Sequence, residues 1–266
     1  MNKNSRGYNI YDKAELKKLQ ASAHLASKAL KLMLDLALPG NSTKQIDQAV
    51  EIFLKDNNAT PSFKTIEDYN YATCISVNEM IVHGKPSDYI LKEGDVVSLD
   101  VGVCLDGYNS DNARTIVVGD SPQHRKLIKV GEEAFFKAFE VLKSSNLTGD
   151  IGSAIHRKIL SYLDEKNEPI FKVFYLFQGH GIGKALHEPP LIPNMGFPGT
   201  GTTLEVGTSI CIEPIVLYRS SEIETVSDTE IIKQFKSHDL KPSSHYENHI
   251  YISDSGPTIL TNLDLF

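Results

Sequence analysis

Two stretches of this 266-residue chain follow one scheme. Each opens with a glycine and a polar residue, continues as an alternating strand, and places a carboxylate six positions after the glycine. The first is Gly94 to Asp100 and the second is Gly207 to Glu213. A histidine followed within three residues by proline lies upstream of each, at His83 and His187. This repetition predicts two related halves that each deliver a histidine and a strand-borne carboxylate to one shared site.

Helical and strand-like patterns alternate along the rest of the chain. The first helical pattern of charged and apolar residues ends at Pro39 and Gly40, two residues that commonly follow the end of a helix. No linker or low-complexity tract follows, so residues 1–266 are expected to form a single domain. We predict an α+β fold with helices at 12–38, 44–56, 121–144 and 150–165 and strands at 72–77, 96–105, 115–118, 209–217 and 249–253.

Composition restricts the partners and the compartment. The net charge of −7 gives no electrostatic support for binding to a specific nucleic acid or to an anionic membrane. Cys74, Cys104 and Cys211 are widely spaced within apolar runs, which favours reduced thiols over a disulfide framework. The N-terminus shows no signal-peptide pattern, and no run of about 18 apolar residues occurs. We therefore expect a cytoplasmic protein.

Asp100 lies in the apolar strand VVSLDVGV, where a buried carboxylate needs a cation or several hydrogen-bond donors. The dipeptide Asp106-Gly107 then predicts a two-residue hairpin turn. Counting back from this turn places Asp100 opposite Ala113. Asp111 would then be its diagonal neighbour on the same face, about 7 Å away at the backbone. Two carboxylates could share cations there, although Asp111 taken alone could be an ordinary turn aspartate.

Two glutamates repeat the problem in other strands. Glu213 interrupts CIEPIVLY and Glu247 interrupts HYENHIYIS, and each could also be a strand-edge glutamate that faces water. His180 adjoins a glycine-rich turn, where a ligand can approach closely. With the two aspartates, this set is too acidic for a tetrahedral structural zinc. It suits two divalent first-row ions bridged by carboxylates, and hydrolysis by a metal-bridged hydroxide.

The residues also resemble a known family, the type I methionine aminopeptidases of the bacterial kind. The resemblance runs from the first predicted helix to about residue 260. It implies the pita-bread fold, with pseudo-twofold α/β halves around a central antiparallel sheet, as one catalytic domain. The segments that carry it are TPSFK (60–64), CISVNEMIVHGKP (74–86), GDVVSLDVGV (94–103), SDNART (110–115), GHGIGKALHEPP (179–190), CIEP (211–214) and HYEN (245–248).

The resemblance assigns roles to these residues. It implies two divalent ions, Co, Mn, Fe or Zn, and makes Glu213 the candidate proton shuttle. His83 and His187 match histidines that contact substrate without binding metal, and we expect both to position the scissile amide and to donate hydrogen bonds to the oxyanion. The five implied metal ligands are Asp100, Asp111, His180, Glu213 and Glu247.

The implied activity is removal of N-terminal methionine from nascent proteins, after deformylation, when the second residue is small and uncharged. The resemblance further suggests a monomer that meets its substrate near the ribosome.

The implied methionine pocket is where this chain departs from its relatives. Tyr69 and Cys74 occupy positions that usually line the pocket. Ile66 stands where tyrosine is common, and Leu186 stands where phenylalanine is common. The chain has no tryptophan, and it has YENH where YEHT is usual. Both changed positions are still apolar, so a pocket for an unbranched thioether is expected, with its stringency left open.

Two alternatives share the same fold. One is an Xaa-Pro peptidase of the prolidase or creatinase kind, whose members usually carry a further N-terminal domain. The other is a non-catalytic pita-bread module for protein binding, which typically lacks metal ligands. The polar stretch 220–241 could be a substrate-side lid, but a solvated loop is the preferred interpretation.

Overall fold

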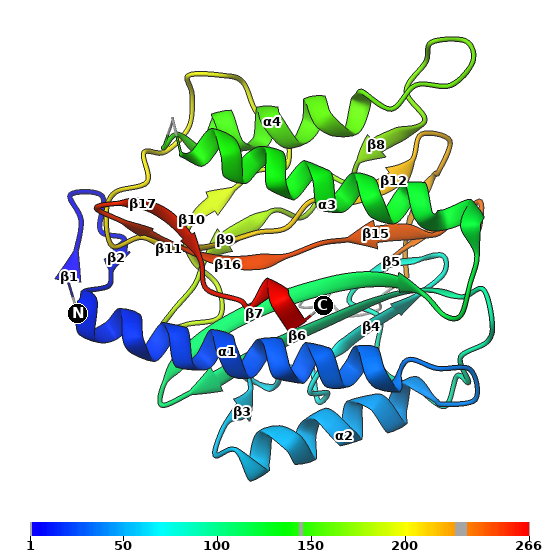
Figure 1. The fold of residues 1–266 in the computed structure, drawn as a ribbon, viewed down its shortest axis with the longest axis horizontal. Coiled ribbons are helices and arrows are strands. Elements are labelled where there is room, and N and C mark those ends of the chain that lie inside the picture. Colours follow the sequence, from blue (N-terminus) through cyan, green and yellow to red (C-terminus); the bar gives the residue numbers. More distant parts are fainter. Residues whose placement is uncertain (1, 144–145, 227–232, 266) are drawn as a thin grey trace.

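A computed structural model describes residues 2–143, 146–226 and 233–265. Two pairs of helices lie on the outer sides of the molecule, with antiparallel strands between them (Figure 1). This arrangement confirms the predicted α+β class. The helices are α1 (Lys13–Leu36), α2 (Thr43–Asp56), α3 (Pro122–Leu142) and α4 (Thr148–Leu160), with short 3₁₀ turns η1 (Ser62–Thr65) and η2 (Leu263–Leu265).

The helices begin and end where local hydrogen bonds require it. Asp12 caps α1 by accepting the N–H groups of Ala14 and Glu15. The predicted fourth helix ends earlier than expected, because the Asp164 side chain accepts the N–H groups of Lys166 and Glu168 and forms a turn. The predicted third helix extended to 144, which lies outside the described residues.

The first half of the chain contains the predicted hairpin. Asp100 pairs with Ala113 and Leu105 pairs with Tyr108, as the two-residue turn requires. The returning strand is longer than predicted, because its polar residues 109–112 are buried in the sheet. The strands of this half are β1 (Asn2–Lys3), β2 (Asn9–Ile10), β3 (Thr60–Pro61), β4 (Cys74–Val77), β5 (Met80–Val82), β6 (Val96–Leu105) and β7 (Tyr108–Val117).

The second half contributes a five-stranded sheet in the order β10-β9-β11-β16-β17. The predicted strand 209–217 is divided into β11 and β12 at Glu213-Pro214, because proline has no N–H to donate to a ladder. The strands are β8 (Phe171–Val173), β9 (Gly179–Gly181), β10 (Glu188–Ile192), β11 (Ser209–Ile212), β12 (Ile215–Tyr218), β13 (Ile223–Thr225), β14 (Phe235–Ser237), β15 (Ser243–His245), β16 (Asn248–Ser253) and β17 (Gly256–Ile259).

The predicted repetition has a structural counterpart. Gly94 and Gly207 both have left-handed backbones, with φ of +88° and +92°. Gly94 donates its N–H to the Val118 carbonyl and Gly207 to the Ile252 carbonyl, each at 2.8 Å. Each glycine thus starts its strand against the far end of the neighbouring strand. Two separate hydrophobic clusters, one under α1 and α2 and one under α3 and α4, form the cores of the two halves.

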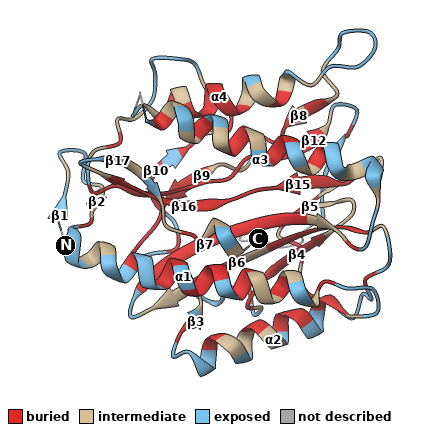
Figure 2. Ribbon diagram, viewed as in Figure 1, coloured by how far each residue is buried: buried red, intermediate tan, exposed pale blue. Residues whose placement is uncertain are grey.

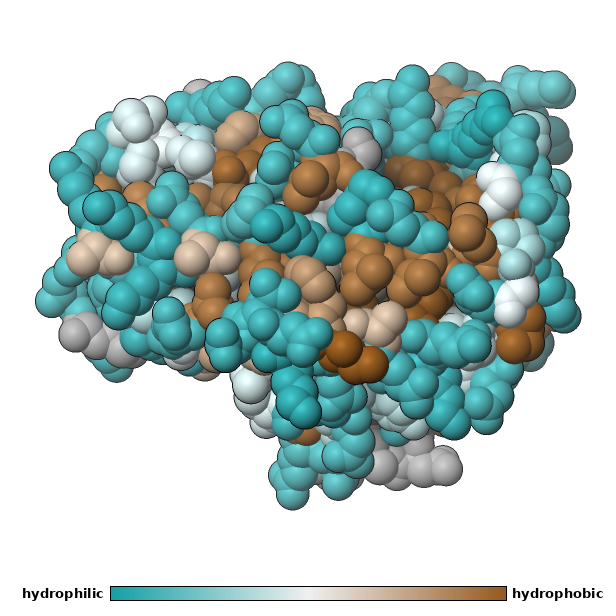
Figure 3. All heavy atoms as spheres, turned by 60° about the horizontal axis from the view of Figure 1, so that its bottom comes forward, coloured by the Kyte–Doolittle hydropathy of each residue, from teal (hydrophilic) through white to brown (hydrophobic). Residues whose placement is uncertain are grey.

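The halves meet where β7 approaches the start of β16. Ala113 and Glu247 exchange two main-chain hydrogen bonds, of 3.3 and 3.0 Å. Buried residues follow the strands and the inner faces of the helices (Figure 2). Hydrophilic side chains cover much of the face in Figure 3, with apolar patches between them. No helix of the described residues is long and apolar enough to span a membrane.

The stretch 220–241 was predicted as a loop, and its described part differs from that prediction. β13 and β14 form a hairpin that adds to β5 through pairs such as Phe235 with Val82. The Phe235 ring packs against Phe174 and Phe177, with centroids 5.4 and 5.5 Å away, and this contact fixes the hairpin. Residues 227–232 of the stretch lie outside the described part.

Candidate metal centre

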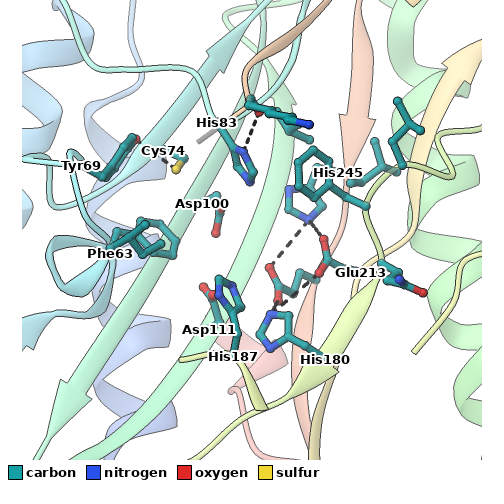
Figure 4. Close-up of a pocket in the computed structure, with 18 of the residues that line it drawn as sticks. Phe63, Tyr69, Cys74, His83, Asp100, Asp111, His180, His187, Glu213 and His245 are labelled. Atoms are coloured by element: carbon teal, nitrogen blue, oxygen red, sulfur yellow. Dashed lines mark hydrogen bonds and ion pairs between the residues drawn. The ribbon is translucent and has the colours of Figure 1, made fainter. Parts of the chain in front are cut away.

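The five predicted ligands come from five places in the chain and line one cavity of about 440 Å³ (Figure 4). Asp100 lies on β6, Asp111 on β7 and His180 on β9, while Glu213 directly follows β11 and Glu247 directly precedes β16. Both halves of the molecule therefore contribute to the cavity.

Strand register brings the carboxylates together. Asp100 pairs with Ala113, and Ala113 pairs in turn with Glu247, so the two carboxylates lie in one row across the junction of the halves. Asp111 pairs with Gly102, one diagonal step from Asp100 as predicted. The Ile212–Asn248 pair, continued by one residue, places Glu213 beside Glu247.

Burial makes these carboxylates costly to ionise. Asp111 is 3% exposed and Glu247 is 2% exposed. Burial first, and then the charge of Glu213, raise the pKa of Asp111 from 3.8 to about 8. Burial and the other carboxylates also raise the pKa of Asp100 and of Glu247 well above their ordinary values.

Several of these oxygens have no hydrogen-bond partner among the described residues. They are Oδ1 of Asp100, Oδ1 of Asp111 and Oε1 of Glu247. His180 offers Nε2 at 3.8 Å from Glu213 and 3.9 Å from Glu247. Buried carboxylate oxygens that converge with an imidazole nitrogen can hold a cation, and this donor set fits first-row divalent ions.

The two histidines expected to meet substrate line the same cavity. The His187 ring lies edge-on to the His180 ring, with centroids 4.5 Å apart. Protein atoms packed around the His187 ring, and then the His180 ring, lower the pKa of His187 to about 4, although other parts of the residue face solvent. His83 has a left-handed backbone with φ of 58° and places Nδ1 3.0 Å from the Lys233 carbonyl oxygen.

Three of the four residues predicted to form a methionine pocket line the cavity. Ile66, Tyr69 and Cys74 line it, and the Tyr69 hydroxyl donates to the Thr73 carbonyl at 2.8 Å, which fixes the ring. Leu186 is not among the lining residues. It is buried in the same apolar cluster behind the pocket, so its contact with substrate stays a prediction.

Phe63 and His245 are among the lining residues that were not predicted from the sequence. Phe63 packs edge-on against Tyr69, with ring centroids 6.3 Å apart. His245 lies between Glu213 and Glu247, with Nε2 at 3.4 and 3.7 Å from their oxygens. Strand alternation could have identified His245, because it stands two residues before Glu247 and side chains at that spacing share a face.

A cavity in which buried carboxylates and an imidazole converge between two related halves is typical of a metal-dependent hydrolase. Metallopeptidase family M24 matches residues 17–254, and the chain belongs to this family. Within the family it is similar to methionine aminopeptidases. It is 40% identical over 248 residues to the methionine aminopeptidase of Clostridium perfringens. The matched region covers 93% of this chain and 96% of that protein.

Solved structures agree with this placement. A methionine aminopeptidase from Thermotoga maritima has a TM-score of 0.86 at 32% identity, covering 96% of this chain and 99% of that chain. A prolidase from Pyrococcus furiosus has a TM-score of 0.73 at 25% identity, covering 95% of this chain and 65% of that chain. The pita-bread fold and the predicted family are confirmed.

Proposed function

We propose that this protein removes N-terminal methionine from nascent proteins after deformylation, when the second residue is small and uncharged. One observation carries the proposal. The cavity is lined both by the carboxylate and histidine cluster and by an apolar group of Phe63, Ile66, Tyr69 and Cys74. A side chain that packs against this apolar group brings the first peptide bond of its own residue to the ligands. The similar proteins named methionine aminopeptidases support the same activity.

Asp100, Asp111, His180, Glu213 and Glu247 would hold two divalent ions, drawn from Co, Mn, Fe and Zn. Such ions lower the pKa of a shared water and make hydroxide available near neutral pH. The free amine of the substrate is expected beside these carboxylates, which confines cleavage to the first residue.

Glu213 is suited to move the proton. Burial pushes its pKa upward, but the neighbouring His245, His180 and His187 rings outweigh burial and lower the pKa below its ordinary value. An ionised Glu213 can accept the proton of the attacking water and return it to the leaving amine.

The contacts of His83 favour one part of its expected role, the positioning of the scissile amide. A carbonyl oxygen only accepts, so Nδ1 of His83 must donate to the Lys233 carbonyl. Burial lowers the pKa of His83, which favours the neutral ring. Its Nε2 is then an acceptor, and we propose that it accepts the N–H of the scissile amide. His187, also neutral near pH 7, would donate its ring N–H to the carbonyl oxygen.

Release of free methionine tests the proposal. We would compare Met-Ala-Ser, Met-Lys-Ser, Leu-Ala-Ser and Ala-Pro-Ser, with the protein loaded in turn with Mn, Co, Fe and Zn. Cleavage of Met-Ala-Ser alone is the expected result and would show that Ile66 still shapes a stringent pocket. Cleavage of Leu-Ala-Ser as well would mean a relaxed pocket.

The same assay separates the alternatives. Cleavage of Ala-Pro-Ser would favour an Xaa-Pro peptidase. Silence with every metal, despite stoichiometric binding, would favour a non-catalytic binding module. All five ligand positions are filled by residues that can bind metal, which supports the enzyme over that module.

Three further properties belong to this proposal. All three cysteines are unpaired, which agrees with a reducing, cytoplasmic location. The protein is expected to meet its proposed substrate near the ribosome, where new N-termini emerge. A monomer is expected, and light scattering at micromolar concentration would test it.

A further inference from the structure

His245 and His180 face the same two glutamates from opposite sides (Figure 4). His180 Nε2 lies 3.8 and 3.9 Å from Oε1 of Glu213 and Oε1 of Glu247. His245 Nε2 lies 3.4 and 3.7 Å from Oε2 of Glu213 and Oε2 of Glu247. Each imidazole therefore meets one oxygen of each carboxylate, and the two sets of oxygens are different.

The His245 ring nitrogen is buried and unsatisfied. His245 is 6% exposed, and its Nε2 has no hydrogen-bond partner among the described residues. Ligand atoms that each lie about 2.1 Å from one ion are roughly 3 to 3.5 Å apart, so an imidazole and a carboxylate at the observed spacing are close to sharing a cation. A structural histidine at this depth would normally have found a partner.

Asp100 completes the group on this side. Single ligand atoms of Asp100, His245 and Glu247 all lie within 4.8 Å of one another. Oδ1 of Asp100 is enclosed and also lacks a hydrogen-bond partner in the described part of the chain. Asp100 on β6, His245 on β15 and Glu247 directly before β16 thus bring one possible ligand atom each to the same place.

Main-chain hydrogen bonds hold the backbone of His245, and this determines the face of the sheet from which its side chain extends. The His245 N–H donates to the Thr115 hydroxyl at 2.7 Å, and that hydroxyl donates to the His245 carbonyl at 3.0 Å. His245 also pairs with Ile215 in the sheet. Its side chain is held on the face that carries Glu247, two residues later.

We propose that His245 is a sixth protein ligand, which holds the second of the two ions together with Asp100 and Glu247. The inference rests on the proposed dinuclear centre. It changes that centre from one imidazole for two ions to one imidazole for each. Because imidazole suits Zn, Co and Fe better than Mn, the second position should prefer those three metals and fill at lower free concentration than an all-carboxylate position.

Metal binding tests this independently of turnover. We would titrate the metal-free protein with Co²⁺ and Zn²⁺, count bound ions by mass spectrometry after dialysis, and record X-ray absorption of the zinc-loaded wild type. Two zinc ions per chain with one imidazole per zinc are expected. In His245→Gln and His245→Ala, one ion should stay tight and the second should weaken at least about tenfold. His187→Gln removes an imidazole that forms no ion pair with Glu213 or Glu247 among the described residues, and it should keep both ions.

Other outcomes overturn the proposal. Wild type with one imidazole per two zincs, or variants that hold both ions with wild-type affinity, would leave His245 as a neighbour of Glu213 only. A wild type that binds a single ion would also overturn it. The absorption measurement on wild type needs no variant to fold. Two ions with one imidazole each, but no methionine release from Met-Ala-Ser, would refute the proposed function and leave His245 as a ligand.

Discussion

Asp111 on β7 is one of the five predicted metal ligands. It is a diagonal neighbour of Asp100 and is almost fully buried. In Asp111→Asn, a neutral amide would replace a carboxylate of the proposed metal centre. Methionine release should therefore fall more than about a hundredfold, since losing even an outer partner of a metal ligand costs about 10–100-fold. Asp106→Asn is the matched control, because it lies in the turn of the same hairpin and asparagine tolerates its φ of 51°. Unchanged turnover in Asp111→Asn would exclude it as a ligand.

Gly102 lies beside the apolar group that lines the cavity. A Cβ added there would lie 2.9 Å from the Phe63 ring and 3.0 Å from the Ser62 Cβ. Gly102→Ala should therefore push Phe63 toward the methionine side chain and raise KM for Met-Ala-Ser several-fold, with a smaller change in kcat. The double variant Gly102→Ala with Phe63→Leu should recover part of the loss, because the two sites are in contact. If the effects of the two substitutions on KM simply added, the proposed contact between Gly102 and Phe63 would be contradicted.

The hairpin of β13 and β14 is expected to position His83. Its Gln234 side chain donates to the His83 carbonyl at 2.7 Å, and its Lys233 carbonyl accepts from the ring. Gln234→Ala should lower kcat by about tenfold or more through misplacement of the ring, with metal content unchanged. Glu224→Ala, on the same hairpin but paired with Lys236, should leave kcat unchanged. Equal effects of the two variants would mean that the hairpin acts only through stability.

Elements with a strong local pattern could be predicted from the sequence. The Asp106-Gly107 turn and a period of two fixed the register that places Asp100 opposite Ala113. β13 and β14 were missed because their pairing partner, β5, lies about 150 residues earlier and no local signal reports it. The protonated nitrogen of His83 was missed for the same reason, since it depends on the distant Lys233 carbonyl.

At the scale of the molecule, Arg114 joins the two halves. Its guanidinium donates to the carbonyls of Ala113 and Glu247 and to the Asn248 side chain, and stacks 3.9 Å from the Tyr246 ring centroid. Arg114→Met should lower the free energy of unfolding by about 2–4 kcal/mol, because the Ala113 and Glu247 carbonyls and the Asn248 side chain each lose one buried charged donor. Urea denaturation would measure it.

The control for Arg114 is Arg157→Met on the exposed side of α4. That change should stay within about 0.5 kcal/mol. A similar stability for both variants would show that the main-chain bonds between Ala113 and Glu247 suffice to hold the halves together.

The metal-free molecule should lose stability as pH rises from about 6.5 to about 8. Burial raises the pKa of Asp111 from 3.8 to about 8, so the folded chain keeps a proton that the unfolded chain has released. The contribution of protonated Asp111 to the free energy of unfolding is complete below pH 3.8. It is lost as the pH rises through the pKa of Asp111 in the folded chain. His187 and His249 have pKa values below the ordinary 6.5, so their effect is to raise stability as the pH rises toward 6.5. Above pH 6.5 they no longer titrate, and the loss of stability comes from the carboxylates.

Thermal unfolding in a chelator would therefore show a falling Tm above pH 6.5, with a smaller fall in Asp111→Asn. Divalent ions, which bind the folded state, should restore the wild-type Tm most strongly at pH 8, where fewer protons compete for the carboxylates. A wild-type Tm that is flat across this interval without metal would mean that some other positive charge already neutralises Asp111 in the folded chain.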